Sequence, residues 1–258
     1  MVHIMSQRVV ITGGASGIGL TLARRFAERG DRVALCDADA AAVAQVQADH
    51  PDMLARQADV TDEAAMQAFF DEVETAFEGV DVLCANAGTG GPAGRIEDLD
   101  YGEWQACIGV NLNGAFLACR WAARLMRAQG SGLILITSST SGFHGVPYRS
   151  PYVAAKWGLV GITKTLAMEL GPAGVRVNAI APGAVEGARM ERVLQMEAKA
   201  NGLTVEETRA LYVKGTSLRT WVTGDDLADM ALFLASPAAG KVTGQLLAVD
   251  GHTESMVP

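Results

Sequence analysis

The chain has few of the residues that stabilise secreted proteins or bind metal ions. Its 258 residues include four cysteines and four histidines, with no Cys-x-x-Cys pair and no histidine at metal-ligand spacing. This pattern gives no sign of a disulfide framework and predicts no metal site. We expect buried thiols in a protein of a reducing compartment, and these thiols belong to Cys36, Cys84, Cys107 and Cys119.

Long apolar runs and an excess of basic residues are also missing. No apolar run approaches the roughly 18 residues that a membrane-spanning helix needs, and no early apolar segment follows a basic stretch. Asp and Glu outnumber Lys and Arg by 29 to 21, for a net charge of −8. An acidic protein is poorly suited to nucleic acid or anionic membranes. We therefore predict a cytoplasmic protein with neither as a partner.

Short apolar runs alternate with helical patterns along the whole chain. The runs predict strands at 8–12, 33–36, 54–58, 80–85, 133–136, 175–180 and 246–249. The helical patterns cover about 20–29, 40–48, 62–77, 101–128, 150–170 and 227–235. This alternation predicts an α/β fold, a doubly wound parallel seven-stranded sheet of Rossmann type with helices on both faces.

No linker, repeat or low-complexity tract divides the sequence, so we expect one domain over 1–258, with 1–7 as a short disordered lead. Residues 184–221 interrupt the alternation with two charged helical patterns, at 189–200 and 204–213. Long excursions of this kind are typically lids or binding loops, which predicts a substrate lid before the last helix and strand. Residues 223–226 predict a capping box that opens the helix after the lid.

A glycine-rich turn follows the first predicted strand. Gly13, Gly17 and Gly19 would let backbone N–H groups approach a pyrophosphate at the positive end of the next helix. Their spacing is Gly-x-x-x-Gly-x-Gly and not the common Gly-x-Gly-x-x-Gly, and a turn that merely connects two elements is the alternative.

An acidic residue ends the second predicted strand. Asp37 could accept hydrogen bonds from both hydroxyls of a ribose, and it would repel a 2′-phosphate. No Lys or Arg stands at 38–40 to receive such a phosphate. The sequence therefore favours NAD, with NADP less suited. A helix N-cap role for Asp37 is the alternative, and it would not exclude ribose binding.

A hydroxyl, a phenol and an ammonium can converge between the fifth strand and the next helix. Tyr152 and Lys156 lie four residues apart on one helix face, and Ser139 follows the strand. We expect Ser150 to cap this helix and Pro151 to be its first residue.

An ammonium about 4 Å from a phenol, at an effective dielectric near 20, contributes about 4 kcal/mol toward the phenolate. Tyr152 could then act as general acid and base near neutral pH, with Ser139 holding the substrate oxygen. A helix whose Tyr and Lys only cover surface is the alternative. Ligands of parallel sheets bind beyond the carboxyl ends of the strands, however, and the candidates Gly13, Asp37, Asn86, Ser139 and Pro182 all follow such ends.

Seven motifs in this order resemble the short-chain dehydrogenase/reductases. They are Thr12-Gly13-x-x-x-Gly17-Ile18-Gly19, Asp59-Val60, Asn86-Ala87-Gly88, Asn111, Ser139, Tyr152-x-x-x-Lys156 and Pro182-Gly183, and the resemblance covers about 9–251. It implies an NAD-dependent oxidoreductase that transfers hydride between nicotinamide and a small secondary alcohol or ketone. It also implies a homotetramer, with the helices that carry Asn111 and Tyr152 at one interface.

The resemblance implies a role for each matched residue. Tyr152 would be the general acid/base, Lys156 would lower its pKa and bind the nicotinamide ribose, and Ser139 would orient the substrate. Asn111 would hold a water that relays protons to Lys156. The residues expected to line the dinucleotide are Gly13, Ser16, Gly17, Ile18, Gly19, Asp37, Asp59, Val60, Asn86, Ala87, Gly88, Tyr152, Lys156, Pro182, Gly183 and Val185.

The sequence departs from the family pattern after Pro182-Gly183. Many members carry a threonine four residues after that glycine, where it contacts the nicotinamide carboxamide, and Gly187 stands near this place. The backbone of Val185 would then have to make the contact. The small residues Ala154, Ala155, Gly158 and Gly161 would allow close packing between subunits, or they face the sheet.

Cationic side chains flank the expected mouth of the site. Arg149, Arg189 and Arg192, with His144, would suit a carboxylate or another anion, and solvated surface or a subunit contact is the alternative. We expect a small polar secondary alcohol, which means a polyol, a sugar or a hydroxy acid. A competing function is a non-catalytic dinucleotide-binding regulator or scaffold with the same fold. The complete set of Asn111, Ser139, Tyr152 and Lys156 favours the enzyme.

Overall fold

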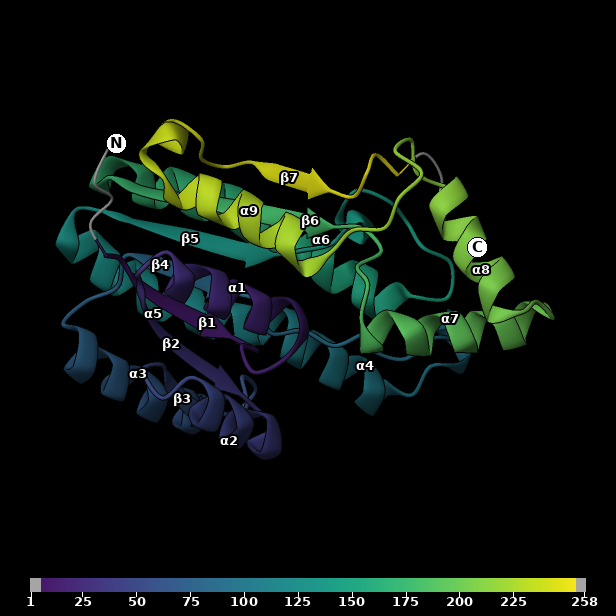
Figure 1. The fold of residues 1–258 in the computed structure, drawn as a ribbon, viewed down its shortest axis with the longest axis horizontal. Helices are drawn as coiled ribbons and strands as arrows, with labels where there is room; N and C mark the ends of the chain where they lie inside the picture. Colours follow the sequence, from purple (N-terminus) through teal and green to yellow (C-terminus); the bar gives the residue numbers. More distant parts are fainter. Residues whose placement is uncertain (1–5, 254–258) are drawn as a thin grey trace.

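Seven parallel strands form one sheet in the computed structural model, which describes residues 6–253 (Figure 1). Their order is β3-β2-β1-β4-β5-β6-β7, so the sheet grows in opposite directions from β1 and β4. The strands are β1 (Arg8–Thr12), β2 (Arg32–Asp37), β3 (Leu54–Gln57), β4 (Val82–Ala85), β5 (Gly132–Thr137), β6 (Val175–Pro182) and β7 (Leu246–Val249). The predicted doubly wound sheet is confirmed, and each predicted strand overlaps an observed one.

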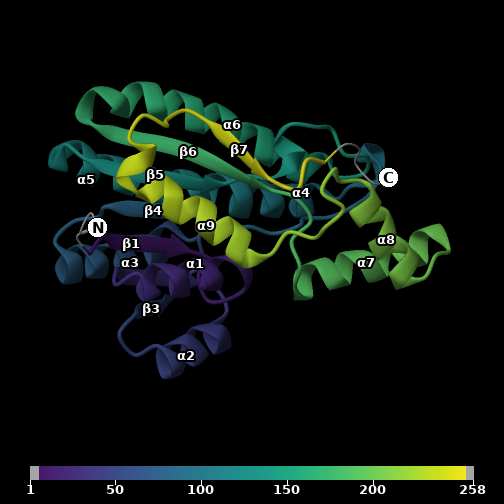
Figure 2. The same cartoon turned by 45° about the horizontal axis from the view of Figure 1, so that its top comes forward.

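Helices cover both faces of the sheet (Figures 1 and 2). One face packs against α1 (Gly17–Glu28), α2 (Ala40–Asp49) and α9 (Gly224–Ala235), and the other against α3 (Glu63–Phe77), α5 (Gly114–Gln129) and α6 (Ser150–Leu170). Val9 and Ile11 join the first core, and Val10 between them joins the second. Side chains of a strand alternate between faces, so burial on both sides explains why these strands are continuous apolar runs.

The helical pattern over 101–128 folds as three segments and not as one. α4 (Tyr101–Ile108) runs into a π-helical turn, η2 (Gly109–Asn113), and α5 follows at once. Asn111 lies in the turn and is buried. Single π turns are frequent at functional sites because the inserted residue redirects one side chain. The helical pattern predicted over 101–128 is thus confirmed, with a π turn at Asn111 that the pattern did not indicate.

The start of α6 also differs from the prediction. Arg149 and not Ser150 is the N-cap residue, since its carbonyl accepts the first helical hydrogen bond, from Val153 N. Ser150 is the first helical residue, and its buried hydroxyl has no hydrogen-bond partner among the described residues. Pro151 fits inside the first turn because no intrahelical bond needs its missing N–H there. The cap predicted at Ser150 was wrong by one residue.

Residues 184–221 contain α7 (Ala188–Asn201) and α8 (Val205–Lys214), as the charged patterns predicted. Both helices lie beyond the arrowheads of the strands in Figures 1 and 2. The excursion is closed at its base, where Glu186 N donates to Val222 O (2.8 Å). The predicted capping box is confirmed, since Thr223 and Asp226 bond reciprocally at the start of α9. No helix within 6–253 is both long and apolar enough to span a membrane.

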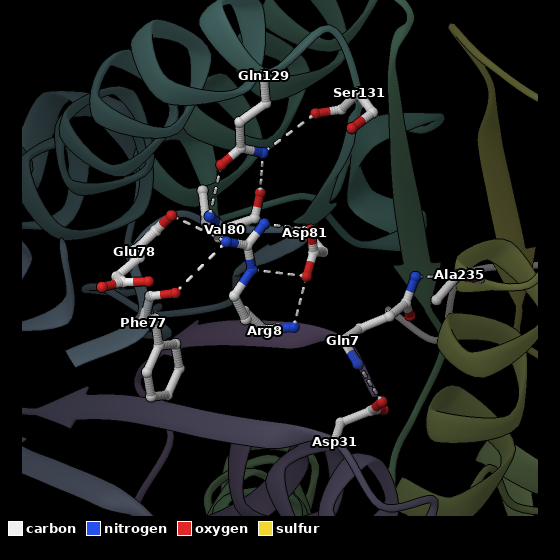
Figure 3. A network of polar contacts seen from close by, with 10 residues as sticks. All are labelled: Gln7, Arg8, Asp31, Phe77, Glu78, Val80, Asp81, Gln129, Ser131 and Ala235. Carbon is white, nitrogen blue, oxygen red and sulfur yellow. Dashed lines mark hydrogen bonds and ion pairs between the residues drawn. The ribbon is translucent and has the colours of Figure 1, made fainter. Parts of the chain in front are cut away.

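A polar network ties the amino ends of the strands together (Figure 3). Asp81 accepts hydrogen bonds from Arg8 N (2.8 Å), Arg8 Nε (2.9 Å) and Arg8 Nη2 (2.7 Å). Gln129, the last residue of α5, pairs its amide with both backbone groups of Val80. Gln7 N donates to Asp31 Oδ1 (2.9 Å), so the expected disordered lead was wrong at this residue. Residues 1–5 of that lead lie outside the described residues.

We expect Asp81→Ala to destabilise the fold by about 2 kcal/mol, because the charge-assisted hydrogen bonds from Arg8 are lost. Burial raises the pKa of Asp81, but the hydrogen bonds from Arg8 outweigh burial and lower it overall. Their stabilisation is therefore complete above the ordinary carboxyl pKa and is lost as the pH falls through the lowered value. Urea unfolding measures the difference, which should shrink in acid, and the exposed Asp52→Ala serves as control.

Candidate functional site

The predicted residues meet at the carboxyl ends of β1, β4 and β5, on either side of the point where the sheet reverses its order. Asn86, directly after β4, makes the central link. Its Nδ2 donates to Gly13 O (3.0 Å), and its Oδ1 accepts from Thr137 Oγ1 (3.1 Å). Asn86 N and Ala87 N both donate to Thr12 Oγ1. Thr12 and Thr137 were not predicted as site residues, although their positions at strand ends signalled them.

The glycine-rich turn is packed too closely for side chains. A Cβ on Gly13 (φ +61°) would lie 2.7 Å from Ala87 Cα, and one on Gly19 would lie 1.9 Å from Gly13 O. Ser16 is the N-cap of α1 but makes no side-chain capping bond, and the first turn contains no acidic residue. The helix N-terminus therefore keeps its backbone donors available for an anionic ligand. This geometry fits the pyrophosphate of a dinucleotide.

Asp37 lies half-buried at the end of β2, beside that turn. Its Oδ2 accepts from Ala15 N (3.1 Å), and its Oδ1 accepts from Asp39 N (3.2 Å). Asp39 caps α2, because its carboxylate accepts from Ala41 N and Ala42 N. The alternative of Asp37 as the helix cap is therefore wrong. Within 6–253, Asp37 forms no ion pair that would cancel its charge.

Asp59 and Val60 follow β3 and differ in exposure. Asp59 is exposed, and its Oδ1 accepts from Thr61 N and Thr61 Oγ1 at 2.8 Å each. Val60 is buried against the start of α5, where a Cβ on Gly114 would lie 2.6 Å from Val60 Cγ2. Asp59 is thus accessible to a ligand, whereas Val60 is almost enclosed by the protein.

Lys156 is buried beneath the ring of Tyr152. Its Nζ donates to Thr137 O (3.0 Å) and lies 5.4 Å from the Tyr152 ring centroid. Burial raises the pKa of Tyr152, but Lys156, Arg189, the nearby Ser139 hydroxyl and Arg149 outweigh burial and lower it below the ordinary value. Burial also lowers the pKa of Lys156, which the negative charge of a Tyr152 phenolate partly opposes. The arrangement therefore makes Tyr152 a stronger acid than a free tyrosine, with its base form favoured.

Asn111 is held by backbone groups on both sides of its amide. Its Nδ2 donates to Thr89 O (3.0 Å) and Cys107 O (2.9 Å), and its Oδ1 accepts from Thr89 N (3.3 Å). A Cβ on Gly88 would lie 3.0 Å from Asn111 Oδ1 and 3.6 Å from Lys156 Nζ. The absence of a side chain at Gly88 thus lets these two groups face the same space.

Comparison with known proteins identifies the family. A family model described as enoyl-(acyl carrier protein) reductase matches residues 13–252. The D-beta-hydroxybutyrate dehydrogenase of Rhizobium meliloti (strain 1021) is 34% identical over 260 residues, which cover 96% of this chain and 98% of that protein. The chain belongs to the short-chain dehydrogenase/reductase family. It is thus an oxidoreductase with the Rossmann-like fold of that family.

Other short-chain dehydrogenase/reductases match nearly the whole chain. The cis-4-hydroxycyclohexanecarboxylate dehydrogenase of Sinomonas cyclohexanicum is 37% identical over 256 residues, 97% of this chain and 98% of that protein. An NAD+-bound xylitol dehydrogenase has a TM-score of 0.89 and 28% identity, covering 95% of this chain and 98% of its own. A variant actinorhodin polyketide ketoreductase with NADPH has a TM-score of 0.91 and 31% identity, covering 95% and 96%. Both cofactors therefore occur among its structural relatives.

The departure from the family pattern after β6 has a structural counterpart. Gly187, where many members of the family carry threonine, has φ +139° and is the N-cap of α7. A threonine would be strained in this conformation. Gly183 is also confined, since a Cβ there would lie 2.7 Å from Asp250 Cβ. Among the described residues, Val185 N and O take no part in the hydrogen bonds that close the base of 184–221, so both remain free for a ligand.

Two of the predicted cations lie close to the ring of Tyr152. The guanidinium carbons of Arg149 and Arg189 lie 5.3 Å and 5.9 Å from the Tyr152 ring centroid. His144 is exposed and its ring contacts Phe143 instead. Arg192 is exposed, on the same helix as Arg189. Sequence spacing could not distinguish these four residues, because the distinction depends on how the loop before α6 and residues 184–221 fold over the sheet.

Proposed function

We propose that this protein is an NAD-dependent dehydrogenase/reductase that interconverts a small polar secondary alcohol and its ketone. The observation that carries the proposal is the lowered pKa of Tyr152 beside the buried Lys156 ammonium, at the carboxyl ends of the central strands. A phenol with a lowered pKa can remove a proton from an alcohol or return one to a carbonyl. The hydroxyl of Ser139 and the phenol of Tyr152 would both hydrogen-bond the substrate oxygen.

The residues of this chain divide the work around the cofactor. Gly13, Ser16, Gly17, Ile18 and Gly19 would hold the pyrophosphate, and Asp37 the adenosine ribose. Asp59 and Val60 would flank the adenine, and Asn86, Ala87 and Gly88 would line the cofactor. Lys156 would bind the nicotinamide ribose, and Val185 the carboxamide, beside Pro182 and Gly183. When bound, the nicotinamide accepts or donates the hydride of the reaction. Asn111 would hold the water through which the proton of Tyr152 reaches solvent, by way of Lys156.

The negative charge of Asp37, which no ion pair within 6–253 neutralises, supports NAD over NADP. We expect Asp37→Ala to improve the preference for NADP over NAD by tenfold or more, because two like charges at about 4 Å repel by about 4 kcal/mol at an effective dielectric near 20. Asp37→Asn removes the charge but keeps an oxygen that can accept from Ala15 N, so it distinguishes the effect of the charge from the effect of the hydrogen bond to the loop. Kinetics with both cofactors measures the ratio, and the exposed Asp49→Ala is the control. A wild-type preference for NADP would contradict the assignment.

A substrate panel tests the activity itself. Polyols, sugars and hydroxy acids, each supplied with NAD, are followed by the absorbance of the reduced nicotinamide. The relatives named for xylitol, for D-beta-hydroxybutyrate and for cis-4-hydroxycyclohexanecarboxylate support this range of polar alcohols. Turnover of at least one class is expected, and absence of turnover across the panel would count against the proposal.

Three further expectations belong to this proposal. Residues 184–221 would act as a substrate lid, because α7 carries Arg189 to within 5.9 Å of the Tyr152 ring centroid. A homotetramer is supported by the exposed Phe116, Trp157 and Met168 on α5 and α6. Of the small residues on α6, Ala154 and Gly161 are exposed and could pack against another subunit, whereas Ala155 is buried within this chain.

The four free, buried cysteines are consistent with a protein of the cytoplasm.

A further inference from the structure

Two guanidinium groups from different elements converge on one loop residue. Arg149 precedes α6, and Arg189 lies in the first turn of α7. A Cβ built on Gly90 would lie 3.5 Å from Arg149 Nη2 and 3.7 Å from Arg189 Nη2. Both groups therefore border the same small space, in the loop after β4. The same guanidinium groups flank the Tyr152 ring, so this space adjoins the point of proton transfer.

These two cations are not neutralised by the protein around them. Within 6–253 neither forms an ion pair with a carboxylate. Glu197 of α7 is close enough for Arg149 to act on its charge, but both Glu197 oxygens accept from Tyr212 OH at 2.9 Å. Lys156 adds a third positive charge beside Tyr152. Arg149 is half-buried and Arg189 is exposed, so water and ligands can reach the Arg189 guanidinium. An anion that joins these like charges would relieve their mutual repulsion.

One donor of this group is also unsatisfied. Arg149 Nη2 donates to Gly90 O (2.9 Å), but the buried Nε of Arg149 has no hydrogen-bond partner among the described residues. Buried polar groups in proteins are normally hydrogen-bonded, so an unmatched N–H beside a cluster of cations points to a missing acceptor. An anionic oxygen of a ligand would supply it.

We propose that Arg149 and Arg189 bind a carboxylate of the substrate, and that the substrate is a short hydroxy acid with a secondary hydroxyl. This inference rests on the proposed function, since the hydroxyl must reach Tyr152 while the carboxylate reaches the two arginines. A carboxylate is favoured because its two oxygens can each accept from a different guanidinium group. The product is the corresponding keto acid, and the oxidant is the cofactor already invoked, which takes the hydride while the hydroxyl proton passes to Tyr152.

The test compares acids with neutral esters of the same shape. The probes are 3-hydroxybutyrate and 4-hydroxycyclohexanecarboxylate, with their methyl esters, assayed with NAD on the full chain. The wild type should favour the acids. In Arg189→Gln, kcat/KM for the acids should fall about tenfold to a hundredfold more than for the esters, as expected for lost hydrogen bonds to a charged group. Arg189 also acts on Tyr152, but that effect is common to acid and ester, so their ratio isolates the carboxylate contact.

Matched variants distinguish the contact between the arginines and the carboxylate from a nonspecific effect of positive charge on α7. Arg192→Gln removes the same charge from the same helix at an exposed position and should leave the ratio of acid to ester unchanged. Arg149→Gln should act as Arg189→Gln does. Calorimetry with cyclohexanecarboxylate, which has no hydroxyl to oxidise, measures binding without turnover. Its binding should weaken at least tenfold in Arg189→Gln and remain in Arg192→Gln.

The possible failures differ from one another. Oxidation of polyols and esters as efficiently as acids, with no special loss in Arg189→Gln, would overturn the carboxylate site and leave the proposed function intact. A preference for sorbitol 6-phosphate over the acids that depends on the two arginines would overturn the choice of carboxylate. If no alcohol is oxidised, the proposed function fails. In that case the anion site is judged from the binding of cyclohexanecarboxylate alone. Binding that is lost in Arg189→Gln supports the site, and binding that is unchanged in Arg189→Gln overturns it.

Discussion

Tyr152→Phe is expected to lower kcat by about a thousandfold or more, because the substitution removes the phenol hydroxyl that we propose exchanges a proton with the substrate oxygen. Phenylalanine keeps the ring against Arg149, Arg189 and Lys156, so the packing of the site should persist. Binding of NADH, measured by its fluorescence, should remain within a few-fold of the wild type. The expected signature is therefore loss of turnover with retention of cofactor.

The control for this prediction is Tyr101→Phe, which removes a phenol hydroxyl from an exposed position at the start of α4. It should leave turnover unchanged. Undiminished turnover in Tyr152→Phe would eliminate the proposed proton transfer. Wild-type binding of NADH without turnover of any alcohol would instead favour the alternative of a non-catalytic dinucleotide-binding protein.

Lys156→Met is expected to lower kcat for alcohol oxidation about a hundredfold at neutral pH, within the range of general acid–base effects. Lys156 is the strongest of the influences that lower the pKa of Tyr152, so its removal raises that pKa and leaves less phenolate at a given pH. Oxidation requires the phenolate, and the rising limb of the pH–rate profile should therefore move to higher pH. The loss should be smaller at alkaline pH than at neutral pH. A methionine of similar volume also avoids a large cavity.

The matched control is Lys164→Met, the same substitution on the same helix at an exposed position two turns further on. It should move neither the rate nor the profile. Arg189→Gln should shift the limb in the same direction as Lys156→Met, because Arg189 also lowers the pKa of Tyr152. Equal losses for Lys156→Met at every pH would show that Lys156 acts only by binding the cofactor, and would refute its effect on the tyrosine.

The fold was predictable because each of its elements has a local signature. The buried strands are apolar runs, α3 and α9 begin at side-chain caps, and the glycine turn after β1 leaves no room for side chains. Local detail within the helices was less predictable. The π turn at Asn111 and the cap at Arg149 have no strong local signature, since both depend on contacts with loops distant in sequence, at Thr89 and Gly90.

The sequence by itself determined the order of the strands and helices, the family, and the pairing of Tyr152 with Lys156, because side-chain type and spacing along one helix face are local properties. Only the tertiary structure decided which cations adjoin the tyrosine. It placed the guanidinium groups of Arg149 and Arg189 within 6 Å of the Tyr152 ring centroid, while His144 contacts Phe143, and it matched Lys156 with the carbonyl of Thr137. Such pairings join residues from separate loops, and their distances depend on how the helices pack on the sheet, which no local pattern records.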